Sequence, residues 1–266
     1  MTVNSGFCRK LKPGCSIRKL AIFEVIIFHM ADIRNEKKET VESMFDSIAW
    51  RYDFLNRLLS FGIDRHWRRK AIMIISQNLK PGHVLDVATG TGDFSIEAVK
   101  LNPEKITGID ISENMLSIGR KRIEKKGLSG RIELLRGDSE NMPFDDNSFD
   151  LVMSAFGVRN FSDCLSGVKE MTRVVKNKGV VMILEFSIPE NRLFRNVFSI
   201  YFFRIVPFIG HLLSGHRSAY RYLPESVENF PGREEFAELM QKAGLTNVTY
   251  NCFTCGIVTV YTGSKV

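Results

Sequence analysis

The sequence predicts an α/β fold, a doubly wound and mostly parallel sheet that ends in an antiparallel hairpin. Between residues 83 and 186, short apolar runs alternate with amphipathic stretches, which is typical of strand–helix–strand units. The later runs 248–252 and 257–262 have no helix between them, so we expect them to pair antiparallel. The chain has 266 residues, of which 44% are hydrophobic and 25% charged. That is enough for one such domain with a sizeable core.

The stretch HVLDVATGTGD, residues 83–93, is the centre of the prediction because it combines a strand, a glycine-rich turn and a helix start. Gly90 and Gly92, on either side of Thr91, permit a sharp turn and the close approach of a ligand. The helix expected over 94–101 points its first amide groups into that turn.

Two common glycine-loop functions are disfavoured here. A dinucleotide loop has a third glycine where this chain has Ser95, and a phosphate-binding loop ends in a lysine that is absent. The remaining pattern, Asp-x-Ala-x-Gly-x-Gly-Asp, is the first motif of S-adenosylmethionine (SAM) methyltransferases. Asp86 and Asp93 lie where they can meet the amino group of SAM, and the loop amides suit its carboxylate.

Acidic residues follow the next two predicted strands. Asp110 ends the strand 106–110, a position from which a carboxylate binds ribose hydroxyls in doubly wound folds. Asp138 and Ser139 follow the strand 132–136 and suit an adenine amino group. The turn at 142–150 before the next strand is familiar from class I methyltransferases. Together these features predict a class I SAM-dependent methyltransferase, a Rossmann-like sheet of seven strands, with SAM as cofactor.

The remaining elements are assigned from periodicity and turn residues. We expect strands at 149–156 and 179–186, and helices at 112–126, with Ser112 as N-cap, at 162–175 and at 232–243. The predicted boundaries are a basic tail over 1–29, N-terminal helices over 30–80 that form a lid, and the methyltransferase domain over 81–266, with an apolar substrate-lid insertion at 190–222.

The tail carries much of the net charge. It has five basic residues and one acid, a balance of +4 out of the total of +7. Its apolar run, 20–28, is too short to span a bilayer. We interpret the tail as disordered or as an extension upstream of a start at Met30, and next as a segment that touches membranes.

The five cysteines, an odd number without framework spacing, indicate a reducing compartment. Cys252 and Cys255 form one isolated C-x-x-C pair, which suits a hairpin better than a metal site, so no metal is expected. The basic helix near 64–79 has one aromatic residue in its charged turn, Trp67. We interpret it as a solvated face or an anionic-lipid contact, without a nucleic-acid partner.

Three longer motifs resemble one family, the ubiquinone/menaquinone biosynthesis C-methyltransferases. The resemblance spans about residues 40–264 and rests on these segments: Phe45-Asp46-Ser47-Ile48-Ala49, running through Tyr52-Asp53 to Asp64-Arg65-x-Trp67-Arg68-Arg69; Phe156-Gly157-Val158-Arg159-Asn160; and Tyr220-Arg221-Tyr222-Leu223-Pro224-Glu225-Ser226 after Leu184-Glu185-Phe186-Ser187. The chain departs from relatives at His216, where an acid is frequent, and at Ala155, where some have serine.

The resemblance implies methylation of a ring carbon of a polyprenyl quinol, with demethylmenaquinol as the expected substrate. It places Arg159 as the partner of a developing phenolate and Asn160 as a ligand of a quinol oxygen. Tyr52 would close over the ring or relay a proton. Asp93 is a candidate base acting through water, with His211 and His216 as alternatives.

The aromatic stretch 194–213 could line a pocket for the lipid tail or form a dimer interface. Arg204 and Pro207 exclude it as a membrane-spanning helix. A cytoplasmic protein that touches the inner face of the membrane is therefore expected, with a homodimer as a further option. The alternative functions are a ubiquinone-precursor C-methyltransferase, a methyltransferase-like binding protein without catalysis, and an RNA methyltransferase.

Overall fold

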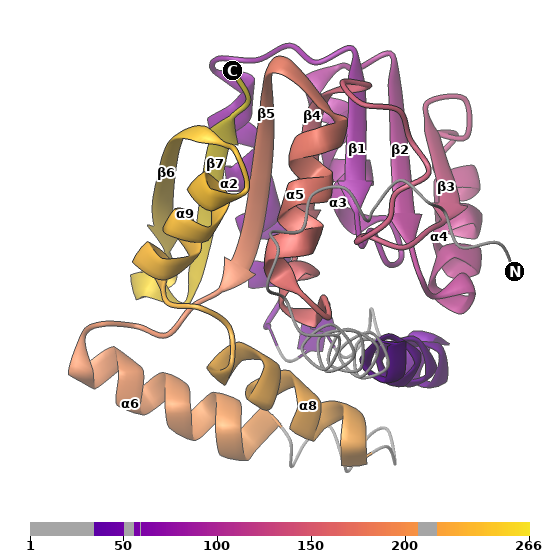
Figure 1. Ribbon diagram of the computed structural model, residues 1–266. Coiled ribbons are helices and arrows are strands. Elements are labelled where there is room, and N and C mark those ends of the chain that lie inside the picture. The colour runs from indigo at the N-terminus through magenta and orange to yellow at the C-terminus, as the bar shows by residue number, and fades with distance from the viewer. Residues whose placement is uncertain (1–34, 51–55, 59, 207–216) are drawn as a thin grey trace, which may run out of the picture.

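The computed structural model describes residues 35–50, 56–58, 60–206 and 217–266, and its centre is a seven-stranded sheet (Figure 1). The strand order is β3-β2-β1-β4-β5-β7-β6, and β7 runs antiparallel to both of its neighbours. This confirms the predicted parallel sheet with a terminal hairpin. The strands are β1 (His83–Val87), β2 (Lys105–Asp110), β3 (Ile132–Arg136), β4 (Phe149–Ala155), β5 (Val175–Phe186), β6 (Thr246–Phe253) and β7 (Val258–Ser264).

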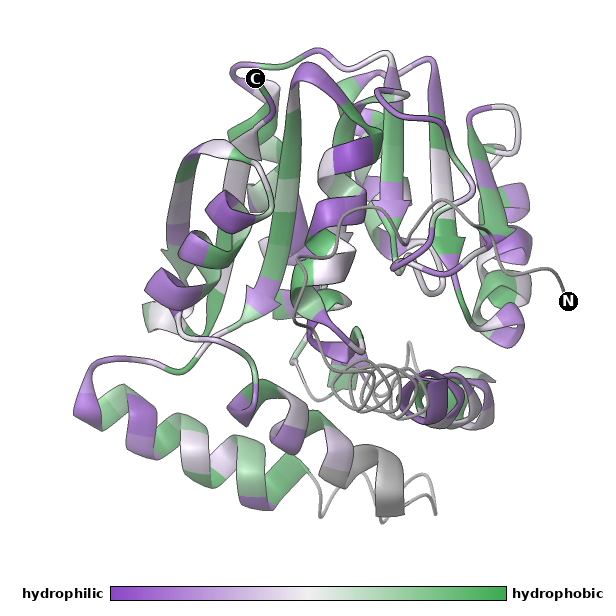
Figure 2. Ribbon diagram, viewed as in Figure 1, coloured by the Kyte–Doolittle hydropathy of each residue, from purple (hydrophilic) through white to green (hydrophobic). Residues whose placement is uncertain are grey.

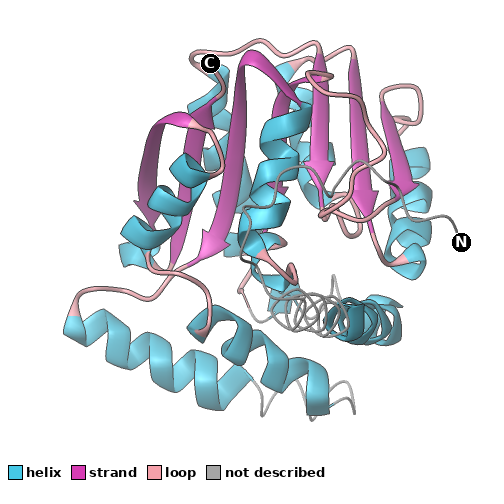
Figure 3. Ribbon diagram, viewed as in Figure 1, coloured by secondary structure: helices cyan, strands magenta, loops and turns pink. Residues whose placement is uncertain are grey.

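Helices cover both faces of the sheet (Figure 3). One face packs against α2 (Ile63–Ser76), α3 (Asp93–Ala98) and α4 (Glu113–Lys125). The other face packs against α5 (Cys164–Val174) and α9 (Arg233–Lys242). Adjacent strand residues point to opposite faces, so Val84 belongs to the first core cluster and Leu85 to the second. The central strands are thus buried on both sides, which explains their continuous apolar runs.

Three helical segments lie beyond the carboxyl ends of the parallel strands, on the side where α/β proteins bind ligands (Figure 1). They are a helix over residues 35–50, α6 (Arg192–Ile200), which continues as a π-helical turn (Tyr201–Ile205), and α8 (Arg217–Glu228). Val41 and Ile48 of the first helix are buried against the domain. Among the described residues, no helix is both long and apolar enough to cross a membrane.

The strand order reverses between β1 and β4, so the chain leaves these two neighbours in opposite directions. Both strands end in a left-handed residue, Ala88 with φ 55° and Phe156 with φ 60°. Such a conformation is costly for a bulky side chain and is found mostly where function requires it. The switch point is therefore strained on both sides.

Several observed boundaries differ from the predicted ones by a few residues, and in two places the structure shows the reason. β4 ends at Ala155 because the left-handed Phe156 turns the chain out of the sheet. β5 begins at Val175 rather than at residue 179, since Val175 pairs with Phe149 across a register shift that sequence periodicity does not reveal. The predicted N-cap is confirmed, because the Ser112 hydroxyl accepts a hydrogen bond from the Met115 amide. Residues 1–29 lie outside the described part, and the domain boundaries remain predictions.

Gly157 allows the two strained strand ends to approach each other. A Cβ at this position would lie 2.6 Å from the Cβ of Ala88 and 2.9 Å from Ser154 Oγ. We expect Gly157→Ala to lower the melting temperature by roughly 2–10 °C, since overpacking costs about 1–3 kcal/mol. Gly130→Ala is the matched control because no atom lies within 4 Å of its Cβ position. Equal melting temperatures in calorimetry would contradict this account.

Candidate active site

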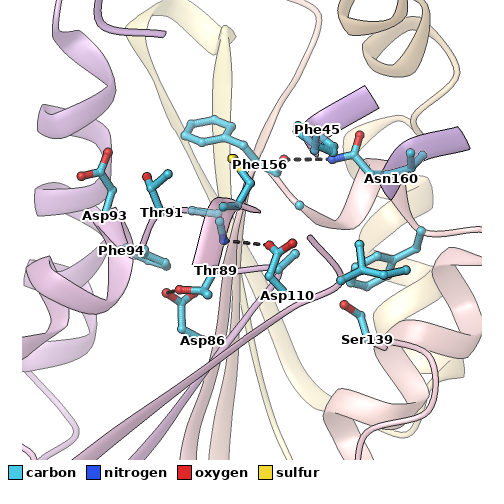
Figure 4. A pocket seen from close by; sticks show the side chains of 18 of the residues that line it. Phe45, Asp86, Thr89, Thr91, Asp93, Phe94, Asp110, Ser139, Phe156 and Asn160 are labelled. Atoms are coloured by element: carbon cyan, nitrogen blue, oxygen red, sulfur yellow. Dashed lines mark hydrogen bonds between the residues drawn. The ribbon is translucent and has the colours of Figure 1, made fainter. Parts of the chain in front are cut away.

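A cavity opens where the strand order reverses between β1 and β4, and the glycine loop forms part of its wall (Figure 4). Of the predicted site residues, it brings together Asp86, Gly90, Thr91, Asp93, Asp110, Asp138, Ser139 and Asn160. We call it the loop cavity. Side chains from four strand ends therefore meet at one place, as the positions after the strands predicted.

The glycine loop is held by the acid at the end of the next strand. The Gly90 amide donates to Asp110 Oδ2 at 2.8 Å, and the Ser112 amide donates to Asp110 Oδ1 at 2.9 Å. Asp110 thus also caps the turn before α4, while its carboxylate faces the cavity (Figure 4). Gly92 does not line the cavity. It serves the turn instead, with φ 77° at the start of α3.

Asp86 lies beneath the loop and is fully buried. It accepts hydrogen bonds from the hydroxyls of Thr89 and Ser95, both at 2.6 Å. Ser95 stands where a dinucleotide-binding loop has its third glycine, and its hydroxyl fixes the position of the Asp86 carboxylate. The second carboxylate oxygen of Asp86, Oδ1, has no hydrogen-bond partner among the described residues. A buried oxygen of this kind at a cavity wall suits a ligand amino group.

Burial raises the pKa of both Asp86 and Asp110 to about 6. Hydrogen bonds oppose this shift in each case, from Ser95 and Thr89 to Asp86 and from the Ser112 and Gly90 amides to Asp110. Near neutral pH most of both carboxyls are ionised, and a modest acidification protonates them. The site is thus sensitive to pH just below neutrality.

Asp138 is engaged by the helix over residues 35–50. Its Oδ2 accepts from Lys38 Nζ at 2.7 Å, and its Oδ1 accepts from the Glu140 amide at 2.8 Å. Glu140 also lies 3.5 Å from Lys38 Nζ. The Asp138 carboxylate, which is predicted to bind the adenine amino group, is therefore already bound to Lys38. Adenine would either bind beside the lysine or displace it.

Asp93 forms an ion pair with Arg122 of α4. Burial alone would raise the pKa of its carboxyl, but the charges of Arg68, Arg122 and Arg57 outweigh burial and lower it. A carboxylate with a lowered pKa is a weak proton acceptor. The environment of Asp93 therefore suits the holding of the loop better than the removal of a proton.

Asn160 and Arg159 share a 3₁₀ turn, Val158–Asn160, but face different spaces. Asn160 lines the loop cavity, where its Oδ1 is buried without a partner among the described residues. Arg159 lines a second cavity and forms a buried ion pair with Glu185, with 3.2 Å between Nη1 and Oε2. The partner of Arg159 is thus Glu185, while Asp163 caps α5. Tyr52, His211 and His216 lie outside the described residues.

The second cavity has a volume of about 290 Å³ and lies between α2, α6, α8 and the helix over residues 35–50. Most of its wall is aromatic or aliphatic, and we call it the aromatic cavity. Its apolar lining includes Phe45, Ile48, Phe61, Trp67, Phe156, Phe186, Phe198, Phe202, Val206 and Leu223. Phe45, Arg68 and Phe156 line both cavities, which are therefore neighbours with a common wall.

Two polar side chains of the aromatic cavity, Arg68 and Tyr222, and the buried Glu185 behind Arg159 were not assigned a role from the sequence. Arg68 pairs with Asp64 at 2.6 Å and lies over the ring of Phe156, with 5.5 Å between Cζ and the ring centre. Glu185 neutralises Arg159. The buried hydroxyl of Tyr222 has no partner among the described residues. All three fall within segments of the family motifs, which was the only sequence signal, because their contacts depend on the tertiary fold.

A family model described as the ubiE/COQ5 methyltransferase family matches residues 30–265. The chain belongs to this family. It is 45% identical over 253 residues to "Ubiquinone/menaquinone biosynthesis C-methyltransferase UbiE" of Geobacter sulfurreducens, covering 94% of each chain. It is 45% identical to "Demethylmenaquinone methyltransferase" of Bacteroides fragilis, covering 86% of this chain and 94% of the relative.

The fold is shared with more distant methyltransferases. A SAM-dependent methyltransferase of Thermotoga maritima, described as a possible histamine N-methyltransferase, superposes with a TM-score of 0.60 at 22% identity. The match covers 85% of this chain and 99% of the other. The predictions of fold class, family, enzyme class and SAM as cofactor are confirmed. The partly buried Asp110 and the buried Asp86 are acceptors in the loop cavity, and they fit the hydroxyl and amino donors of SAM. The individual roles of the site residues remain proposals.

The raised pKa values lead to a prediction about SAM affinity. Ligand hydroxyls donate to an ionised carboxylate, so affinity should be full above the folded pKa and fall as the pH drops through about 6. We expect calorimetric Kd values to rise about tenfold between about pH 7.5 and about pH 5 for each carboxylate coupled to binding.

Asp110→Asn is the control for this titration. It should bind SAM more weakly above about pH 6 and lose part of the pH dependence, because it has no charge to titrate. The free energy of unfolding is predicted to change with pH in the direction opposite to the SAM affinity. Since the folded state prefers the protonated carboxyl, Asp110 and Asp86 lower the stability as the pH rises from 3.8 towards about 6. A SAM affinity that is constant with pH would contradict the proposed contacts.

Proposed function

We propose that this methyltransferase transfers a methyl group to a ring carbon of a polyprenyl quinol, converting demethylmenaquinol to menaquinol. The observation that carries the proposal is the aromatic cavity beside the loop cavity, because a SAM enzyme needs an adjoining site for its second substrate. An aromatic wall suits a flat quinol ring. The names of the relatives support the substrate class. The Geobacter sulfurreducens relative is named for both ubiquinone and menaquinone, and the Bacteroides fragilis relative for demethylmenaquinone alone.

The reaction places two demands on the protein. Bound SAM supplies an electrophilic methyl group. The ring carbon becomes nucleophilic only as a neighbouring hydroxyl gives up its proton, so the protein must stabilise the phenolate that forms. Phe45 and Phe156 stand between the cavities and would hold the ring carbon in line with the methyl group.

Arg159 is the cation proposed to stabilise the phenolate. Its guanidinium is already tied to Glu185, to Ser226 Oγ at 3.2 Å and to the Phe156 carbonyl, so its position is fixed before substrate arrives. Glu185 offsets its charge, which makes it a directed hydrogen-bond donor rather than a net positive charge. Burial raises the pKa of Tyr222, so this phenol stays protonated and can donate to the quinol oxygen.

Asn160 is proposed to orient a quinol oxygen from the side of the loop cavity, where its own buried oxygen has no partner among the described residues. Tyr52 remains the proposed closing or relaying group. Asp93 is the less favoured candidate for a base acting through water, because its lowered pKa makes it a weak proton acceptor. The helix over residues 35–50 is proposed as a lid, because Lys38 and Phe45 reach into the loop cavity from it.

The alternatives find less support. Trp67 of the basic helix is buried and donates to Thr254 Oγ1 at 2.7 Å, so it is not available to stack on a base. A ubiquinone precursor would use the same chemistry and the same residues. We propose that the enzyme works on the cytoplasmic side of the membrane, where its lipid substrate lies.

The cellular test is mass spectrometry of quinones from a strain in which the gene has been deleted. The menaquinone pool should become lighter by one methylene, and the chain on a plasmid should restore it. A shift in the ubiquinone pool alone would select the alternative substrate. Unchanged quinones in a strain without a second such enzyme would overturn the proposed function.

Tyr222→Phe tests the phenolate site without removing a buried charge. We expect methyl transfer in single turnover to slow by roughly ten- to a hundredfold, somewhat less than the loss of an oxyanion-hole donor. SAM affinity and melting temperature should be nearly unchanged, since the hydroxyl has no partner among the described residues.

Tyr261→Phe is the matched control. Its hydroxyl is also buried, but it belongs to the core beside α9 and lines neither cavity. It should turn over normally. If Tyr222→Phe does the same, the hydroxyl has no part in catalysis.

A further inference from the structure

Helix α6 and its π-helical turn are apolar on two opposite sides. Phe198, Phe202 and Val206 are buried and line the aromatic cavity. Residues at the complementary helical spacing point outward, and several are more than half exposed: Leu193 at 69%, Val197 at 60% and Ile200 at 54%. Apolar side chains that gather on the outer side of a helix, when its inner side is already buried, normally mark a surface covered by protein or by lipid.

The exposed apolar surface extends beyond the helix. Phe194 and Ile205 add to it at 44% and 40% exposure. Phe61, at the start of α2, is 78% exposed, and its ring centre lies 6.0 Å from that of Tyr201. Phe61 also has a left-handed backbone, with φ 52°. A bulky side chain held outward at a conformational cost is expected where the outward position has a use. We call these residues, from Phe61 to the outer side of α6, the outer patch.

The charges within the helix of the outer patch are all positive. Arg192, Arg195 and Arg204 are exposed, and residues 191–206 contain no acid. Arg195 donates to the backbone carbonyls of Pro189 and Glu190. Arg204 falls on the outer stripe with Val197 and Ile200, since these positions are seven and four residues apart. Figure 2 shows hydrophobic and hydrophilic residues alternating along this helix.

The outer patch adjoins the mouth of the aromatic cavity. Phe61 and Tyr201 line that cavity and also border the patch. The geometry points to the outer patch as a docking surface for an anionic phospholipid bilayer, through which the quinol head group enters the cavity beside Phe61. This inference rests on the proposed function for its substrate. The apolar side chains insert among the acyl chains, and the arginines meet lipid phosphates.

The test is flotation of the full chain with vesicles of phosphatidylcholine, with or without phosphatidylglycerol. We expect binding to the anionic vesicles that weakens with salt. Val197→Ser/Ile200→Ser should reduce the partition coefficient by at least about tenfold, given the transfer of apolar side chains. Arg192→Ala/Arg204→Ala should reduce it about fivefold for each arginine, corresponding to about 1 kcal/mol each.

Matched controls are available on other faces. Met73 and Val266 are exposed at 57% and 83%, so Met73→Ser/Val266→Ser removes similar apolar surface. Lys121→Ala/Lys125→Ala removes two exposed charges from α4. Both controls should float as the unmodified protein does. All variants should retain the melting temperature, because the altered side chains are exposed.

Activity separates this inference from the proposed function. With a short-tailed quinol in solution, Val197→Ser/Ile200→Ser should turn over normally, while its activity on a long-tailed quinol in vesicles should fall with its binding. If the unmodified protein methylates neither quinol, the proposed function fails, and the flotation result still decides the docking surface.

Three results would overturn the docking surface. One is unchanged flotation of both patch variants. Another is binding that depends instead on the tail, shown by its loss in Arg9→Gln/Lys10→Gln/Lys12→Gln. The last is a dimer in sedimentation velocity that Val197→Ser/Ile200→Ser converts to monomer while vesicle binding persists, which would make the patch an interface between two copies of this chain.

Discussion

The left-handed conformation of Phe156 is the constraint on which both cavities depend. It ends β4, turns the ring into the wall that the cavities share, and leaves the carbonyl to accept from Arg159 and Asn160. The ring packs against Trp67 and Phe186, with centroid distances of 6.1 and 4.7 Å. A conformation of this kind costs about 1–3 kcal/mol and persists only where packing determines it. Here the contacts with Trp67 and Phe186, together with the two hydrogen bonds to the Phe156 carbonyl, hold this conformation in place.

Buried charge in the aromatic cavity is compensated locally. Arg159 faces Glu185, and Arg68 faces Asp64, which also accepts from Ser60 at 2.8 Å. Burial raises the pKa of Glu185, because the ionised carboxylate loses its solvation. The charge and hydrogen bonds of Arg159 oppose this shift and favour the ionised form. Removing one member of such a pair leaves a buried charge alone, which costs more than the pair contributes. The pairs therefore fix the positions of donors without giving the cavity a large net charge.

The sequence predicted the features that depend on neighbours along the chain. Asp110 and Asp138 follow strands directly, and the carboxyl ends of parallel strands meet at one edge, so their convergence could be inferred from spacing alone. The pairing of Arg159 with Glu185, across 26 positions, could not be inferred in this way, and neither could the reach of Lys38 to Asp138. Asp163 is the acid nearest to Arg159 in the sequence. The fold instead places β5 beside the turn and leaves Asp163 to cap α5.

Helix α6 has apolar side chains both on its inner side, which lines the aromatic cavity, and on its outer side, which carries the outer patch. Its inner residues bury against Val227 of α8 and enclose the cavity, so the hydrophobic effect holds the helix to the protein from that side. Its outer residues gain nothing from water, and lipid is the environment in which their exposure carries no cost. A quinol head group that enters beside Phe61 therefore passes mostly aromatic and aliphatic side chains. Tyr222 and Arg159, on the wall of the same cavity, are the polar groups proposed to bind its oxygens.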